Sequence, residues 1–388
     1  MSLYPSDTLE ERTQYRMPRV ASLEVFAVKV PFKHSFVLGS GAVGAPGQCG
    51  DVIFVKLTTD SGHVGWGEQR ALPSWSYETP ETIVLVIEKY LSPLLMDLSP
   101  FDVGLFHRRA DKVLSPSVSN GFPFARAAVD VAMHDAAGQI AGLPVHALLG
   151  GKVNSELELC SAIGVDTPAA MVARVEESSE YHAYKVKISG DVRADTEAIH
   201  AVSEVAGGKP LWLDANQSYS PSSMMRLLDR VVDVPGLFCV EQPVPSTDWA
   251  GMKRVQAASR IPVAIDEGSF TSQDLARTIA LGAADMVVIK ICKSGGIRNA
   301  MKTAAVATAN STEILASGLT DCGIGFAASL HLFSNLELAL PAELNGPELL
   351  NDLYVEGLTI TNAIATVPDA PGLGVTVDEE RIRFESHI

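Results

Sequence analysis

Hydrophobic and polar residues in the first part of the chain follow the period of β-strands, and then change to the spacing of helices. The strand-like runs lie at residues 22–30, 51–58 and 63–68, and a turn at residues 60–62 joins the last two. The helix-like runs lie at residues 81–95, 102–113 and 124–141. Strands followed by helices, without alternation, predict an α+β module in residues 17–148.

The pattern changes after this module, because short β-forming runs now alternate with amphipathic segments. The β-forming runs lie at residues 157–165, 184–189, 210–216, 237–243, 262–268, 286–292 and 313–317. Repeated β–α units with apolar strands predict a parallel sheet, and so many of them favour a closed barrel over an open sheet. We therefore expect an α/β fold in which residues 149–345 form a (β/α) barrel. Residues 346–388 return to loop, turn and strand character.

A glycine-rich stretch at residues 35–50 is expected to be a loop. Its G-S-G-A-V-G sequence at residues 39–44 matches the dinucleotide-binding pattern, but an A-P-G sequence rather than a helix follows it. No β–α–β unit surrounds it, so it does not predict a nucleotide site. A lid over a neighbouring site is the better interpretation.

Length and composition indicate a globular protein with more than one structural unit, and they exclude several classes of partner. The chain has 388 residues, 47% hydrophobic and 20% charged, and residues 1–16 are a polar leader for which disorder is an open alternative. No run reaches the roughly 20 apolar residues that span a membrane. The net charge of −16 argues against nucleic acids and anionic membranes as partners. Five scattered cysteines without a C-x-x-C pair favour a cytoplasmic location over a disulfide or zinc protein.

Acidic residues stand at the ends of three successive runs of the expected barrel, namely Asp214, Glu241 and Asp266. The carboxyl ends of barrel strands meet at one face, where catalytic groups gather. Three carboxylates converging there would repel one another unless a hard cation neutralised them, and all-oxygen ligands suit Mg²⁺. Any one of these acids could equally be an ordinary charged residue at the start of a loop. Three of them at successive strand ends favour the metal site over that explanation.

Lysines occupy two further strand ends. Lys185 and Lys187 are two residues apart on one strand and therefore point to the same face. Lys290 ends a strand four positions further round, so it would face Lys187 across the barrel. Buried lysines are costly unless paired or functional, and a nearby ammonium or divalent cation would lower the lysine pKa toward that of a general base. Lys293, in contrast, is expected to be a solvated loop charge.

Together these residues predict abstraction of the α-proton of a small carboxylate substrate. One lysine would remove the proton while the metal holds the resulting enediolate, since positive charge is needed where the oxyanion develops. The opposite lysine would return a proton to the other face or assist a β-leaving group. A metal-binding scaffold without catalysis is the non-enzyme alternative, although a scaffold has no use for two inward ammonium groups.

The motifs resemble the enolase superfamily, in its muconate lactonizing enzyme subgroup, over nearly the whole chain. The matching sequences are V-G-W-G-E at residues 64–68, K-V-K at 185–187, D-A-N at 214–216, V-E-Q-P at 240–243, I-D-E at 265–267, K-I-C-K-S-G-G at 290–296 and P-G-L-G-V at 371–375. The resemblance implies a modified (β/α)7β TIM barrel. It also implies a capping domain built from both chain ends, which closes over the substrate through residues 35–50 and 74–77. Homo-oligomers are frequent in this family.

Carried over onto this chain, the family's functional residues fall on the strand ends already singled out. The resemblance implies Lys187 and Lys290 as the acid/base pair and Lys185 as the group that orients the substrate carboxylate. The Mg²⁺ ligands that it implies are Asp214, Glu241 and Asp266. A His–Asp dyad like that of the mandelate racemase subgroup is missing, because Lys290 occupies the sixth strand end.

Substrate identity depends on the cap and on the last strand ends, where Asp321 and Glu343 suit a substrate with a positive nitrogen. Dipeptide epimerases of the family carry Asp-x-Asp where this chain has Glu343-x-Asn345. A muconate-like dianion would call for basic residues in the stretch 35–50, which has none. The expected function is therefore dehydration or epimerisation of an amino acid or (hydroxy)proline derivative. Muconate-type cycloisomerisation and dipeptide epimerisation are the alternative functions. A purely structural role, in which Asp321 and Glu343 pair with Lys290 or Lys293, is the alternative to substrate binding.

Overall fold

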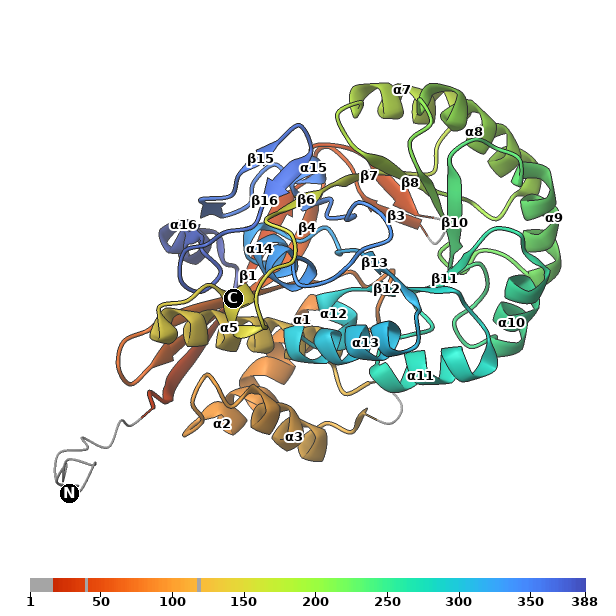
Figure 1. Cartoon of the computed structure of the whole chain (residues 1–388). Helices are drawn as coiled ribbons and strands as arrows, with labels where there is room; N and C mark the ends of the chain where they lie inside the picture. Colours follow the sequence, from red (N-terminus) through yellow and green to blue (C-terminus); the bar gives the residue numbers. More distant parts are fainter. Residues whose placement is uncertain (1–16, 39–40, 117–119) are drawn as a thin grey trace, which may run out of the picture.

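The structure is a computed structural model that describes residues 17–38, 41–116 and 120–388. The leader predicted at residues 1–16 lies outside the described residues. Figure 1 shows a ring of strands wrapped by green and cyan helices, with a smaller assembly of N-terminal strands and helices beside it. We call this smaller N-terminal assembly the cap. The blue C-terminal segment lies against it.

The cap is built on a three-stranded antiparallel sheet, which confirms the predicted strand-like runs. Its strands are β1 (Val20–Pro31), β4 (Cys49–Thr59) and β5 (Val64–Arg70), in the order β1-β4-β5. Helix α5 (Pro123–Ala141) packs directly on β5. A Cβ atom at Gly67 would lie 1.9 Å from the carbonyl oxygen of Ala128 on that helix, so the V-G-W-G-E sequence supplies glycine where the two backbones touch.

Further cap helices contact strands β1 and β4 of this sheet. The predicted helix at residues 81–95 is divided into α1 (Pro80–Val86), a π-helical turn η2 (Ile87–Leu91) and α2 (Ser92–Leu95). Pro93 lacks an N–H for a regular helical hydrogen bond, and the wider turn directly precedes α2. Helix α3 (Val103–Val113) follows as predicted.

Part of the predicted loop at residues 35–50 is a β-hairpin instead. Strands β2 (Phe36–Leu38) and β3 (Gly41–Gly44) pair antiparallel, and residues 39–40 lie outside the described residues. The side chains of Phe36 and Leu38 are buried, because this hairpin covers the mouth of the barrel. The apolar residues within the glycine-rich stretch therefore give it regular structure.

Parallel strands form the barrel wall in the order in which they occur along the chain. They are β7 (Cys160–Ile163), β8 (Ala183–Lys187), β9 (Leu211–Asp214), β10 (Leu237–Glu241), β11 (Val263–Ile265), β12 (Met286–Ile289) and β13 (Glu313–Ala316). Between β7 and β13 the chain at residues 342–343 closes the ring: Cys160 N–H donates to Ala342 O and Glu343 N–H to Ala316 O, both at 2.9 Å. The predicted α/β barrel with a capping module is confirmed.

Helices alternate with these strands and lie outside the ring. They are α7 (Pro168–Glu177), α8 (Val192–Val205), α9 (Pro221–Val231), α10 (Trp249–Ala258), α11 (Ser272–Leu281), α12 (Ile291–Ser294), α13 (Ile297–Ala309) and α14 (Gly323–Phe333). Several begin at a polar residue whose side chain accepts a backbone N–H of the first turn, as Thr167, Ser220 and Thr271 do. No helix among the described residues has the length and apolar content needed to cross a membrane.

The first β-forming run of the barrel, at residues 157–165, is divided between two sheets. Only β7 belongs to the barrel, whereas β6 (Glu156–Glu158) pairs antiparallel with β16 (Ile364–Thr366) of the C-terminal segment. The segment continues to α16 (Glu379–Glu385), where Glu379 forms an ion pair with Lys56 of β4 at 2.6 Å. The C-terminal segment therefore contacts the cap sheet, while the domain limits proposed from the sequence stay predictions.

A buried histidine ties α14 to both neighbouring segments. His331 Nδ1 accepts the N–H of His146 at the start of α6 (Val145–Leu148) at 3.2 Å, and Nε2 donates to Leu373 O at 3.1 Å. The first contact requires the neutral imidazole, because a protonated Nδ1 cannot accept a hydrogen bond. Burial lowers the pKa of His331 from its ordinary value of 6.5 to about 4.

We expect acid to destabilise the protein partly through His331. Its pKa is lower in the folded chain than in the unfolded one, so stability present above pH 6.5 is lost as the pH falls toward 4. Between pH 7 and pH 5 this residue should cost about 2 kcal/mol of the free energy of unfolding. Urea denaturation of His331→Asn should show a flatter pH dependence than the wild type, whereas His200→Asn, on an exposed position of α8, should follow the wild type. Equal slopes in all three proteins would refute this role.

Candidate active site

The register of the barrel strands brings the predicted site residues together at one face. Lys187 pairs with Asp214 across β8 and β9, and Asp214 pairs with Glu241 across β9 and β10. Asp266 and Lys290 come directly after β11 and β12. Because parallel barrel strands end at the same face, these buried side chains share the mouth of the barrel.

The two lysines of β8 are held by carboxylates of the next two strands. Lys187 Nζ donates to Asp214 Oδ2 at 2.5 Å. Lys185 Nζ lies 3.1 Å from Asp214 Oδ2 and 2.9 Å from Glu241 Oε2. Its ammonium also lies 4.2 Å from the ring centroid of Trp212, deeper in the barrel. The role of Lys185 in orienting a substrate carboxylate stays a prediction.

On the opposite side of the mouth, Asp266 binds two lysines. Lys290 Nζ donates to Asp266 Oδ2 at 2.6 Å. Lys293 Nζ donates to Asp266 Oδ1 at 2.7 Å and to the Asp266 carbonyl oxygen at 2.8 Å. The prediction that Lys293 is a solvated loop charge is therefore wrong, because the single turn of α12 turns its side chain back under Asp266, where it is buried.

Between these two sets of ion pairs lies a cluster of acids with room for a cation. Oxygen atoms of Glu241, Asp266 and Glu267 all lie within 4.8 Å of one another. Glu267 is the last residue of the I-D-E motif, and the sequence predicts no role for it. The adjacent acids Asp266 and Glu267 could have indicated a role in this cluster. However, alternation along an extended chain would place only one of the two at the mouth of the barrel.

The oxygen atoms of this cluster fit a hard divalent cation. Asn216 Nδ2 donates to Glu267 Oε1 at 3.1 Å, while Glu267 Oε2 and Asn216 Oδ1 are buried without a hydrogen-bond partner among the described residues. Buried oxygens without donors are unusual, and carboxylate and amide oxygens are the ligands that Mg²⁺ takes. Asp214 lies beside the cluster, and its Oδ2 is turned toward the lysines. The Mg²⁺ ligand set of Asp214, Glu241 and Asp266 stays a prediction, and Glu267 joins it as a candidate.

Burial and mutual repulsion shape the protonation of the acids. Burial raises the pKa of Glu267 to about 7, and the nearby Asp266 and Asp214 add to the rise. Burial also raises the pKa of Glu241 well above its ordinary range, with Asp214 as the next cause. The pKa of Asp266 is lowered, because Lys290 and Lys293 outweigh burial. A cation shared by these oxygens would relieve the repulsion that raises the first two values.

The lysines carry the opposite balance. Burial lowers the pKa of Lys290, but Asp266 outweighs it and the net pKa is above the ordinary value. Burial likewise lowers the pKa of Lys185, but the charges of Asp214 and Glu241 outweigh it, so the net pKa of Lys185 is raised. The carboxylates therefore favour the ammonium forms of both side chains. A divalent cation bound to the same carboxylates would offset their negative charge and so lower the pKa of the lysines.

A cavity lies directly above these residues, between the barrel and the cap. The barrel contributes Lys187, Asn216, Lys290, Gly318, Leu319, Thr320, Glu343 and Asn345, and the cap contributes Phe36, Leu38, Val43, Leu72 and Trp75. The Trp75 ring centroid lies 4.6 Å from Lys290 Nζ, and the Phe36 ring centroid lies 5.8 Å from Lys187 Nζ. The cavity thus has a polar floor with a lysine on each of two opposite strands, and an apolar roof.

Glu343 and Asn345 supply polar oxygens to one wall of this cavity. Glu343 Oε2 accepts from Ser317 Oγ at 2.5 Å, and Glu343 Oε1 accepts from Asn345 Nδ2 at 2.6 Å. Asn345 Oδ1 is buried and has no hydrogen-bond partner among the described residues. This oxygen is therefore ready to accept a hydrogen bond from a molecule in the cavity.

Asp321, the other acid predicted to bind substrate, is not among the described residues that line the cavity. The chain turns at Thr320, which has a φ of 58°, and Asp321 Oδ2 accepts the Leu319 N–H at 3.2 Å. Its carboxyl group lies near Glu68 of β5, whose pKa is raised to about 8 by burial and then by Asp321. Burial raises the pKa of Asp321 itself to about 6. Asp321 thus belongs to the contact between barrel and cap.

Two family models match most of the chain. Residues 22–150 match the N-terminal domain of mandelate racemase and muconate lactonizing enzyme, and residues 169–381 match the enolase C-terminal domain-like family. An N-succinyl-L-Arg/Lys racemase of Bacillus cereus is 26% identical over 94% of this chain and 97% of its own length.

Solved structures of relatives share the whole fold. A muconate lactonizing enzyme from Pseudomonas fluorescens, complexed with muconolactone, superposes with a TM-score of 0.89 at 28% identity, over 96% of this chain and 100% of the other. A dipeptide epimerase from Enterococcus faecalis, complexed with Mg and the dipeptide L-Leu-L-Tyr, gives a TM-score of 0.85 at 27% identity, over 92% and 99%. The relatives therefore differ in substrate while sharing one scaffold.

We expect Mg²⁺ to bind at the acidic cluster and to raise the melting temperature. Glu241→Gln should abolish binding, and Glu267→Gln should weaken it about ten-fold, because each removes a charged oxygen from the cluster. Isothermal titration calorimetry with MgCl₂ measures both. The control is Glu313→Gln at the exposed start of β13, which should bind Mg²⁺ like the wild type. Unchanged affinity in both cluster variants would place the cation elsewhere.

Proposed function

Because this chain belongs to the mandelate racemase/muconate lactonizing enzyme family of the enolase superfamily, we propose that it racemises or epimerises a small carboxylate derived from an amino acid. Membership makes it an isomerase-type enzyme whose reaction begins with removal of a proton next to a carboxylate. What remains to be assigned is the outcome of that step and the substrate. The proposal rests above all on one observation, the pair Lys187 and Lys290 lining one cavity from opposite strands.

Two opposed lysines suit inversion at a carbon atom. A neutral lysine on one face takes the α-proton, and the ammonium on the other face delivers a proton from the opposite side. One proton enters the carbon and one leaves it, so the product has the inverted configuration and the two lysines have exchanged protonation states. Each lysine Nζ contacts its own carboxylate, Lys187 at Asp214 and Lys290 at Asp266, which fixes its position for the transfer.

Mg²⁺ held by the acidic cluster would supply positive charge beside the substrate carboxylate and so make the α-proton more acidic. The aromatic rings of Phe36 and Trp75 lie over the two lysines, which are buried beneath the cap. Trp75 is itself fixed by stacking on Phe124 and Phe270, with ring centroids 6.1 and 5.9 Å away. Burial of the site strengthens the electrostatic stabilisation of the charge that develops on the carboxylate.

The cavity walls indicate what surrounds the reacting carbon. The unpartnered Oδ1 of Asn345 and the neighbouring Glu343 favour an N–H group of the substrate on that side. The apolar roof formed by Phe36, Leu38 and Trp75, with their neighbours, favours an apolar side chain, ring or acyl group. An amino acid derivative, with its nitrogen either free or acylated, meets both requirements, and a proline derivative is within this class.

The alternatives meet the cavity less well. A muconate-like dicarboxylate needs a cation for its second carboxylate, and the two lysines are the only cationic side chains among the described residues that line the cavity. Dehydration of a hydroxyproline-like substrate shares the first proton transfer and differs only in the presence of a β-leaving group. It is therefore the second candidate and is separated from epimerisation by the product.

The test is proton NMR in D₂O with Mg²⁺ and a panel of both enantiomers of N-acyl amino acids, free proline and hydroxyproline, apolar dipeptides and muconate. We expect an N-acyl or apolar amino acid derivative to lose its α-proton signal and to accumulate the other stereoisomer. Lys187→Ala and Lys290→Ala should each reduce inversion at least about a hundred-fold. Each variant should still exchange the α-proton of one enantiomer, the one whose proton faces the remaining lysine.

The control for charge removal is Lys253→Ala, an exposed lysine of α10, which should behave like the wild type. A new carbonyl or imine product without inversion would assign dehydration instead. Turnover of muconate alone would overturn the amino acid proposal. Equal loss of exchange for both enantiomers in both lysine variants would contradict the two-base arrangement.

A further inference from the structure

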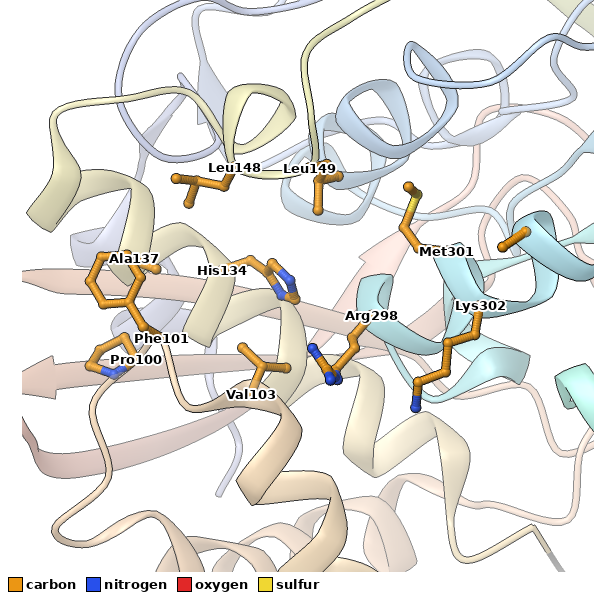
Figure 2. Close-up of a pocket in the computed structure, with 11 residues that line it drawn as sticks. Pro100, Phe101, Val103, His134, Ala137, Leu148, Leu149, Arg298, Met301 and Lys302 are labelled. Atoms are coloured by element: carbon orange, nitrogen blue, oxygen red, sulfur yellow. The ribbon is translucent and has the colours of Figure 1, made fainter.

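A second pocket lies between the cap helices and the barrel helix α13, apart from the cavity described above. It has a volume of about 530 Å³ and shares none of its lining residues with that cavity. Helix α5 forms one wall, α13 faces it, and the start of α3 and the end of α6 complete the rim. Figure 2 shows the side chains of His134 and Arg298 close to each other in the middle of this pocket.

The pocket is cationic in a protein that is strongly acidic as a whole. The chain carries 30 lysines and arginines against 46 aspartates and glutamates. The described lining residues nevertheless include His134, Arg298 and Lys302 and no acid. An anion is the complement of such a pocket, since three donors with positive or potentially positive charge face one space.

His134 is oriented toward the pocket by a buried carboxylate behind it. Its Nδ1 lies 2.8 Å from the Asp130 carbonyl oxygen and 3.0 Å from Asp130 Oδ1, which leaves Nε2 on the pocket side. Burial lowers the pKa of His134, but Asp130 outweighs burial and the net pKa is raised. Asp130 is also bound by His107 at 2.7 Å and by the Ile297 N–H at 2.7 Å, so its position is fixed.

Arg298 is exposed at the edge of this pocket and makes no ion pair or hydrogen bond with any described residue. Its guanidinium lies over Gly104 of α3, where a Cβ atom would come within 2.7 Å of Nη2. Lys302, one turn further along α13, donates to Asn299 Oδ1 at 2.9 Å and keeps further donors. The guanidinium therefore has its planar set of donors available for a ligand.

The remaining walls are apolar. Phe101, Val103, Leu148, Leu149 and Met301 surround the cations, and Phe101 is 39% exposed. A ligand that buries carbon atoms here while pairing with the arginine gains from both contacts. An inorganic ion would leave these walls in contact with water.

We propose that this pocket binds a small organic anion, with a carboxylate or phosphate group on Arg298 and His134 and an apolar body against α5, α6 and α13. The site is independent of the proposed reaction, because it shares no residue with the acidic cluster or with the two lysines. Carboxylate and phosphate ligands make the same contacts here, so both are tested. The size of the pocket suits a ligand with a ring or a short chain.

The experiment is isothermal titration calorimetry of the full chain with 4-phenylbutyrate and with phenyl phosphate. The neutral isostere 4-phenylbutan-1-ol is titrated in parallel. We expect one site for at least one anion, at least five-fold weaker binding of the alcohol, and weaker binding at higher salt, since the arginine is exposed. Arg298→Ala should weaken anion binding about five-fold. Arg254→Ala, an exposed arginine of α10, removes the same charge elsewhere and should leave binding unchanged.

The titrations are repeated in EDTA and in the Glu241→Gln variant, because a carboxylate can also bind at the acidic cluster. Binding that persists in both and falls in Arg298→Ala supports the pocket. Binding that needs Mg²⁺ or Glu241 would place the ligand in the active-site cavity and overturn the proposal. Equal affinity for the alcohol and the anions would show that only the apolar walls bind the ligand, and would overturn the proposal of an anion site. Absence of binding by both anions would overturn the proposal. A changed sedimentation coefficient of Arg298→Ala would then show that a second copy of the chain covers the pocket.

Discussion

Mutual neutralisation of buried charge at the mouth of the barrel is the constraint on which the rest of this structure depends. Lysines on β8 and after β12 are buried together with carboxylates on β9 and β10 and after β11, and an unpaired charge there would be too costly to keep. The strand register meets this requirement by placing Lys187 beside Asp214 and Asp214 beside Glu241. A shift of one residue in any of these strands would turn a charged side chain into the apolar wall between strands and helices. Fold and chemistry are therefore fixed by the same hydrogen-bonded register.

The cap depends on a different constraint, the close approach of β5 to α5. Gly65 and Gly67 allow the strand to touch the helix backbone, and this contact holds the cap sheet directly against α5. Glu68, next in the strand, accepts the N–H of Gly325 at the start of α14 at 2.9 Å. The Glu68 side chain thus anchors the cap to backbone N–H groups of the barrel, while the residues that form the roof of the cavity, such as Trp75, lie on segments that connect the cap elements. A fixed base with variable segments allows one proton-abstraction scaffold to serve several substrates.

The differences between expectation and structure have identifiable causes. Lys293 was expected in solvent, but the single-turn helix α12 returns its side chain to Asp266, and a turn of four residues has no periodicity that a sequence can reveal. Glu267 follows Asp266 directly, and strand alternation would send the two in opposite directions; β11 ends at Ile265, so the alternation no longer applies. Asp321 lies near the end of β13 in sequence, but a left-handed residue at 320 turns it toward the cap.

The sequence by itself determined the α+β module, the barrel and the residues at the strand ends, because period-2 and period-3.6 patterns and polar residues after apolar runs are local properties. It also indicated the reaction class, since lysines and acids at successive strand ends allow few chemistries. Only the tertiary structure decided which side chains line the cavity, that its roof is apolar, and that Arg298 and His134 face one pocket across two helices. These features depend on contacts between segments far apart in the chain, and no local pattern encodes the distance between two such side chains.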